Sequence, residues 1–149
     1  MKTFKDTVGR IWSLNLSVDA VKRVRSLANV NLLEAIEGKL IDRLGNDPVL
    51  LCDVLYALVK PDADAQNVTD VEFGRALGGD AIECATNALL EELVDFFPQP
   101  RRRLLAKALG KLKMFEAKAL SLAEKRLESA ELDARLESAL ANVGGSSGN

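Results

Sequence analysis

Side chains able to do chemistry are scarce in this sequence. It contains no histidine, and its two cysteines, Cys52 and Cys84, stand far apart. Without histidine there is no Ser-His-Asp or Cys-His nucleophile system and no His-ligated zinc site. Two isolated cysteines form neither a CxxC pair nor a four-ligand cluster, which excludes structural zinc and thioredoxin-like redox chemistry. We therefore expect both thiols to be unreactive and to lie in the core or at its edge.

Three other segments could in principle hold a ligand or act on one. Asp62 and Asp64 lie in an expected loop that begins with Pro61 and lacks the central glycine of a calcium-binding loop. Residues 74–80 are glycine-rich but lack the GxxxxGK[ST] pattern of a phosphate cradle, so we expect them to join two helices. Glu91 and Glu92 would point about 100° apart on a helix, which favours a solvated face over an acid–base pair. We predict that the protein is not an enzyme and uses no metal or cofactor.

Charge is segregated along the chain, although the net charge is only −2. Residues 46–97 carry 2 basic and 11 acidic side chains, whereas residues 98–118 carry 7 basic and 1 acidic. The basic patch consists of Arg101, Arg102, Arg103, Lys107 and Lys111. These side chains could contact a nucleic acid backbone, but little aromatic surface accompanies them for base stacking. We favour a basic helix that faces either the acidic segment 46–97 of this chain or an acidic partner, with nucleic acid as the weaker alternative.

The hydropathy pattern predicts a β-hairpin followed by helices. Residues 3–5 and 11–16 are strand candidates around a turn at 6–9, and Trp12 and Leu14 share one face of the second strand. Ser17, Asp47, Thr69 and Asp80 are expected helix N-caps. The expected helices cover residues 18–28, 31–43, 49–59, 69–77 and 81–97. Pro61 is expected to end the third of these, leaving 61–68 as a loop.

A long helix is expected next, because residues 101–142 contain no proline and a single glycine, Gly110. Apolar residues between Leu105 and Leu122 follow a spacing like that of coiled coils, which Arg126 and Ser129 then break. We predict a mainly α (α+β) fold in three parts. Residues 1–98 form the hairpin and a small helical domain, 99–142 a long amphipathic helix, and 143–149 a flexible Gly/Ser tail.

No apolar run is long enough for a transmembrane helix, and the first residues lack the apolar core of a signal peptide. We therefore expect no membrane association and a cytoplasmic location.

Three strings of residues, in this order, resemble tail assembly chaperones of long-tailed bacteriophages and related prophages. They are Phe4-x-Asp6-Thr7-x-Gly9-Arg10-x-Trp12, then Asp47-Pro48-x5-Val54-Leu55-Tyr56-Ala57-Leu58, then Phe73-x6-Asp80-Ala81-x3-Ala85-x2-Ala88-Leu89-x-Glu91-Glu92-x3-Phe96-Phe97-Pro98. The resemblance covers roughly residues 4–105. It implies a non-catalytic assembly factor that coats the tape measure protein, in the host cytoplasm, before the tail tube polymerises. The tail tube protein is a second partner that it implies.

Helix-in-groove binding would cover the apolar stripe of such a long helical client. We expect the groove to be formed by helices 49–59 and 81–97 with residues 101–122. The expected partner-binding residues are Leu51, Leu55, Leu89, Leu93, Phe96, Phe97, Leu105, Leu112 and Phe115. Two alternatives stay open: a helical oligomerisation or adaptor module, and a small DNA-binding regulator that uses Arg101–Arg103. Self-association is expected in either the chaperone or the adaptor interpretation.

Overall fold

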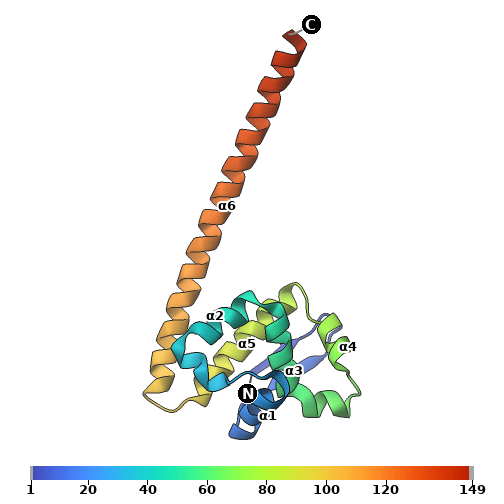
Figure 1. Cartoon of the computed structure of the whole chain (residues 1–149), viewed down its shortest axis with the longest axis vertical. Helices are drawn as coiled ribbons and strands as arrows, with labels where there is room; N and C mark the ends of the chain where they lie inside the picture. Colours follow the sequence, from blue (N-terminus) through green and yellow to red (C-terminus); the bar gives the residue numbers. More distant parts are fainter. Residues whose placement is uncertain (1, 148–149) are drawn as a thin grey trace. The chain divides into compact units, whose positions relative to one another are not determined.

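A computed structural model describes residues 2–147, and the side chains of residues 2–141. Its elements, in chain order, are β1 (Lys2–Lys5), β2 (Ile11–Leu14), α1 (Val18–Ala28), the 3-10 helix η1 (Leu32–Glu37), α2 (Lys39–Asn46), α3 (Pro48–Ala65), α4 (Asp70–Arg75), α5 (Asp80–Phe96) and α6 (Arg101–Ser147) (Figure 1). The predicted mainly α fold with an N-terminal hairpin is confirmed. The chain divides into one compact unit that ends at Leu109 and a second that begins at Gly110.

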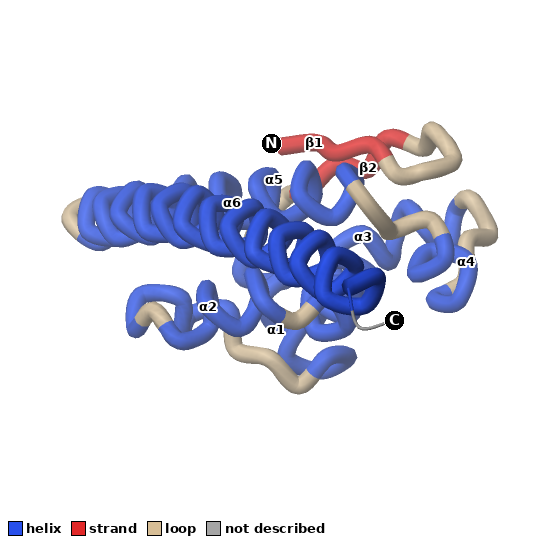
Figure 2. The backbone as a smooth tube through the Cα atoms, turned by 90° about the horizontal axis from the view of Figure 1, so that it is seen from above, coloured by secondary structure: helices blue, strands red, loops and turns tan. Residues whose placement is uncertain are grey.

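The hairpin packs on the helices of the first unit, as a lone hairpin must to be stable. β1 and β2 are antiparallel, with Phe4 opposite Trp12, and both side chains are buried. β1 lies along α5, as Figure 2 shows. The turn between the strands is attached to the end of α4, because the backbone N–H of Thr7 donates to the carbonyl of Ala76.

Helix α3 is the centre of this unit. It contacts α1, α2, α4, α5 and β2, which explains why its sequence is apolar on nearly every side. The predicted start is confirmed, since Asp47 Oδ1 accepts from the backbone N–H groups of Val49 and Leu50 and Pro48 occupies the first turn.

The expected end of α3 at Pro61 is wrong, because the helix continues to Ala65. A proline inside a helix leaves the carbonyl four residues earlier without its N–H donor. Here that carbonyl belongs to Ala57, and Arg23 Nε on α1 donates to it at 2.7 Å. A second nitrogen of the same guanidinium donates to the carbonyl of Leu58 at 3.0 Å. The tertiary contact therefore supplies what the proline removes.

Other helix ends follow the predictions with two exceptions. Ser17 and Thr69 accept from the backbone as N-caps, as expected. The expected helix 31–43 is instead split into η1 and α2, because Gly38 has a φ of 84°. Asp80 is the first residue of α5 rather than its cap, and Gly79 holds the cap position.

The compact unit extends beyond the expected boundary at 98, because Leu105 and Leu109 on the first turns of α6 are buried. Residues 143–147, placed in the expected flexible tail, continue α6, whereas 148–149 lie outside the described residues. Among the described residues, no helix combines the length and the apolar character needed to cross a membrane.

Candidate functional site

Most of the predicted partner-binding residues form the core and do not line a groove. Six of them are at most 3% exposed: Leu51, Leu55, Leu89, Leu93, Phe97 and Leu105. Phe96 and Leu112 are half-buried, and Phe115 alone is widely exposed, at 71%. The prediction of a groove built from these side chains is therefore wrong for the six. They are part of the core of the compact unit, so their side chains are not available on its surface to a partner.

The predicted basic patch is exposed, but one of its members has a structural role. Arg101, Arg103, Lys107 and Lys111 are exposed on α6. Arg102 Nε donates to the carbonyl of Phe97 at 2.9 Å, and another of its nitrogens donates to the carbonyl of Asp95 at 3.2 Å. This guanidinium thus satisfies carbonyls at the end of α5, as basic side chains commonly do at helix C-termini.

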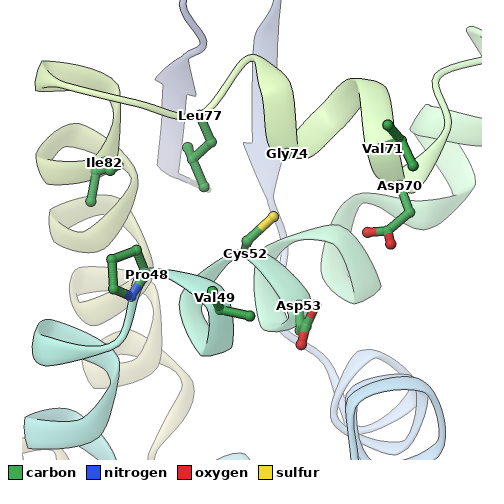
Figure 3. Close-up of a pocket in the computed structure, with 9 residues that line it drawn as sticks. All are labelled: Pro48, Val49, Cys52, Asp53, Asp70, Val71, Gly74, Leu77 and Ile82. Atoms are coloured by element: carbon green, nitrogen blue, oxygen red, sulfur yellow. The ribbon is translucent and has the colours of Figure 1, made fainter.

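A surface hollow of about 310 Å³ lies between the start of α3, α4 and the start of α5 (Figure 3). We call it the α3–α4 hollow, and its lining residues are Pro48, Val49, Cys52, Asp53, Asp70, Val71, Gly74, Leu77 and Ile82. Val49 is 71% exposed and Val71 60%, while Leu77 and Ile82 are half-buried. Apolar side chains therefore make up most of an open surface that faces solvent.

Gly74 lines the α3–α4 hollow without adding a side chain to it. A Cβ at this position would stand 3.7 Å from Cys52 Sγ, so any longer side chain would project into the space. Figure 3 shows the sulfur of Cys52 directed toward the backbone of α4 near Gly74. Helix α4 begins at Asp70, and its N-cap Thr69 accepts from the backbone N–H of Glu72, which fixes the direction in which Asp70 and Val71 leave the loop.

Two carboxylates give one edge of the hollow a negative charge. Burial raises the pKa of Asp53, and the negative charges of Asp70 and Asp47 raise it further. A second hollow of about 280 Å³ shares Asp53 and Asp70 and adds Leu27, Tyr56, Ala57 and Lys60. The two hollows therefore meet at these carboxylates, and a cationic group placed there would relieve their mutual repulsion.

The surroundings of Cys52 favour the protonated thiol, which is a poor nucleophile. Burial raises its pKa to about 11, and the charges of Asp70 and Asp53 act in the same direction. Nucleophilic cysteines instead have pKa values lowered by cationic neighbours. Cys84, expected in the core or at its edge, is exposed on α5.

The remaining candidate ligand residues have other partners or positions. Asp62 and Asp64 lie on the last turns of α3 instead of in a loop, and Lys60 Nζ pairs with Asp64 Oδ1 at 2.7 Å. Glu92, expected on a solvated face, is buried, and its Oε1 accepts from the backbone N–H of Leu16 at 3.3 Å. Within the part of the chain that the structure describes, no group of three acidic or sulfur side chains is placed to hold a metal ion.

Sequence reasoning missed the α3–α4 hollow because its residues come from three helices separated by loops. Two signals pointed toward it. Val49 and Val71 are apolar residues in the first turn of a helix, where polar residues are more usual. The surrounding segment 46–97 also carries the excess of acidic side chains described above.

The fold and this site define a mainly helical protein with an open, apolar hollow edged by carboxylates. A scan against protein-family models, a search of curated proteins and a search of solved structures each found no match.

Proposed function

We propose that this protein is a phage tail assembly chaperone, a non-catalytic factor that holds helical segments of the tape measure protein in the host cytoplasm. The observation that supports this most is the α3–α4 hollow, which presents exposed valines beside carboxylates. Exposed apolar surface with a polar rim is typical of protein-binding sites. The resemblance of residues 4–105 to this chaperone family supports the particular client, and the tail tube protein is a second proposed partner.

The chemistry of the hollow defines what it would bind. Val49, Val71 and Ile82 offer apolar surface to the apolar stripe of an amphipathic helix. Asp53 and Asp70 would pair with lysine or arginine beside that stripe. We therefore propose that the preferred client segments are amphipathic helices with basic flanks. Such segments aggregate when their apolar stripe is uncovered, which is why a chaperone is needed before tube assembly.

Coexpression with the tape measure protein tests the proposal. We expect the tape measure protein to remain soluble with this chain and to precipitate without it. The double variant Val49→Lys/Val71→Lys should lose this protection, because two cations in the hollow would repel a basic client. Val8→Lys is the matched control, since Val8 is 65% exposed and does not line the hollow.

Each result has a direct meaning. Equal solubility of the tape measure protein with and without this chain would refute the chaperone function. Full protection by the double variant would be consistent with the chaperone function but would show that the client does not bind at the α3–α4 hollow. Circular dichroism of each variant checks that loss of protection does not reflect unfolding, and the exposure of both valines leads us to expect folded variants.

An adaptor module that only self-associates is the second candidate, and the exposed leucines of α6 favour it. It predicts a stable oligomer to which no added client binds in sedimentation. A DNA-binding regulator has less support, because Arg102 already binds the end of α5. A mobility shift measured at 50 and 200 mM salt separates this option, since phosphate contacts weaken steeply with salt.

A further inference from the structure

Beyond Gly110, α6 carries a stripe of large apolar side chains. Phe115 and Leu122 are seven residues apart, and Leu132, Leu136 and Leu140 follow at four-residue spacing. At 3.6 residues per turn these five lie within an arc of about 100° around the helix, and we call them the α6 stripe. Their exposed fractions run from 55% to 71%. A stripe of this kind on a helix is normally covered by another helix.

The charges beside the α6 stripe change sign halfway along it. Residues 110–126 carry five basic and two acidic side chains, a net charge of +3. Residues 127–141 carry four acidic and one basic side chain, a net charge of −3. In the first half, Lys111, Lys118 and Lys125 recur every seven residues and fall within the same arc of about 100° as the apolar side chains, so they too face the partner of the stripe. In the second half, the acidic side chains within or just beside the same arc are Glu128, Asp133 and Glu137.

We propose that the α6 stripe binds the same stripe of a second copy of this chain, with the two helices antiparallel. In a parallel pair, each half of the helix would lie beside the same half of the second copy, so that basic side chains face basic ones and acidic side chains face acidic ones. An antiparallel pair places the +3 half of each helix beside the −3 half of the other. Opposite charges along the edges of paired helices select orientation in this way. Charge complementarity therefore identifies both the occupant and its direction.

The positions of individual residues agree with this pairing. When two helices overlap over residues 111–141 with the midpoint at 126, Lys118 lies opposite residue 134 of the second copy, next to Asp133. Phe115 lies opposite residue 137, next to Leu136. Lys125 lies opposite residue 127, next to Glu128. The pairing is two-fold symmetric and closed, so it produces a dimer and not a filament. It does not depend on the proposed client binding, since it uses none of the residues of the α3–α4 hollow.

Charge reversal in the full-length chain tests the proposal. One variant reverses the basic half, with Lys111→Glu, Lys118→Glu and Lys125→Glu. A second reverses the acidic half, with Glu128→Lys, Asp133→Lys and Glu137→Lys. A third carries all six substitutions. The measurement is sedimentation equilibrium at 50 and 500 mM salt, with circular dichroism to confirm that each variant remains helical.

We expect the wild-type chain to dimerise and each half-reversed variant to dimerise about tenfold or more weakly, because like charges then face each other at both ends. The six-fold variant should regain wild-type affinity, since every pair is again opposite in sign. The differences should shrink at 500 mM salt. A parallel pair gives a different result, because reversing one half only exchanges one like-charge repulsion for another.

Apolar substitutions supply a second measurement that does not depend on charge. Leu122→Asn with Leu136→Asn should abolish the dimer at either salt concentration. Leu120→Asn with Leu127→Asn is the matched control, because these leucines are at least as exposed but lie outside the α6 stripe. A monomeric wild-type chain, half-reversed variants that dimerise normally, or a six-fold variant that stays monomeric would each overturn the proposal. None of these results bears on protection of the tape measure protein, so the two proposals fail separately.

Discussion

Arg23 on α1 donates from its Nε to the carbonyl oxygen of Ala57 on α3 at 2.7 Å, and this carbonyl is the one that Pro61 deprives of its helical donor. The same side chain pairs with Asp19 at 3.6 Å and is largely buried. One arginine therefore joins two helices and allows α3 to pass through a proline. We therefore predict that the contributions of Arg23 and Pro61 to stability depend on each other.

A double-mutant cycle tests this dependence. Arg23→Met should destabilise the protein by about 2 kcal/mol, since buried carbonyls lose a charged donor. In a Pro61→Ala background the same substitution should cost about 1 kcal/mol less, because an alanine in place of the proline supplies the missing backbone N–H. Urea unfolding followed by circular dichroism measures all four proteins. Equal costs of Arg23→Met in the two backgrounds would show that the arginine does not compensate for the proline.

Asp6 and Trp12 form a buried hydrogen bond across the hairpin turn, with Trp12 Nε1 donating to Asp6 Oδ2 at 3.0 Å. The other carboxylate oxygen accepts from the backbone of Val8 and Arg10. Asp6→Asn places an amide N–H₂ against the indole donor and should cost about 2 kcal/mol of unfolding free energy. Trp12→Phe removes that conflict, so Asp6→Asn should cost less in its presence. Asp42→Asn, at an exposed position on α2, is the control. Additive effects of Asp6→Asn and Trp12→Phe would contradict this account.

Cys52 should react slowly with alkylating agents at neutral pH. In a Cys84→Ser variant, we expect iodoacetamide to modify the folded chain at pH 8 at least about tenfold more slowly than the chain in urea, because little of the folded thiol is ionised. The raised pKa also sets a direction for stability. It contributes fully below pH 9, where both states hold the proton, and its contribution is lost as pH rises toward 11. Comparison with Cys52→Ser between pH 8 and 11 isolates this loss of stability. Equal alkylation rates for the folded chain and the chain in urea would disprove the low reactivity of the Cys52 thiol.

Asp53 and Asp70 should weaken the folded state slightly while strengthening client binding. Since the folded pKa of Asp53 is raised, its contribution to stability is present below its ordinary pKa and is lost as pH rises through the folded value. Asp70→Asn should therefore raise the urea midpoint at pH 7 and raise it less at pH 3. The same substitution should lower affinity for a basic amphipathic helical peptide, most clearly at low salt. Glu37→Gln, exposed on η1, is the control expected to change neither.

Much of the architecture follows from local patterns. The alternation around Trp12 and Leu14 predicts the hairpin, and Ser17, Asp47 and Thr69 predict helix starts because a cap depends only on neighbouring residues. The stretch after Arg101 contains no proline and many strong helix formers, which are local properties, and it predicts α6 correctly. The failures have a different origin. The predictions for Pro61 and Glu92 are wrong because Arg23, which compensates for the proline, and Leu16, which bonds the glutamate, are distant in the sequence.

The sequence by itself predicted most of the helical segments and several of their N-caps, because these depend on neighbours three or four residues away. Only the tertiary structure decided which apolar side chains are buried. Leu51 and Leu89 are buried in the core, whereas Val49 and Val71 are exposed and line the α3–α4 hollow. The physical reason is that burial depends on what packs against a residue. A helix that is apolar on several sides does not indicate which side its neighbours will leave uncovered.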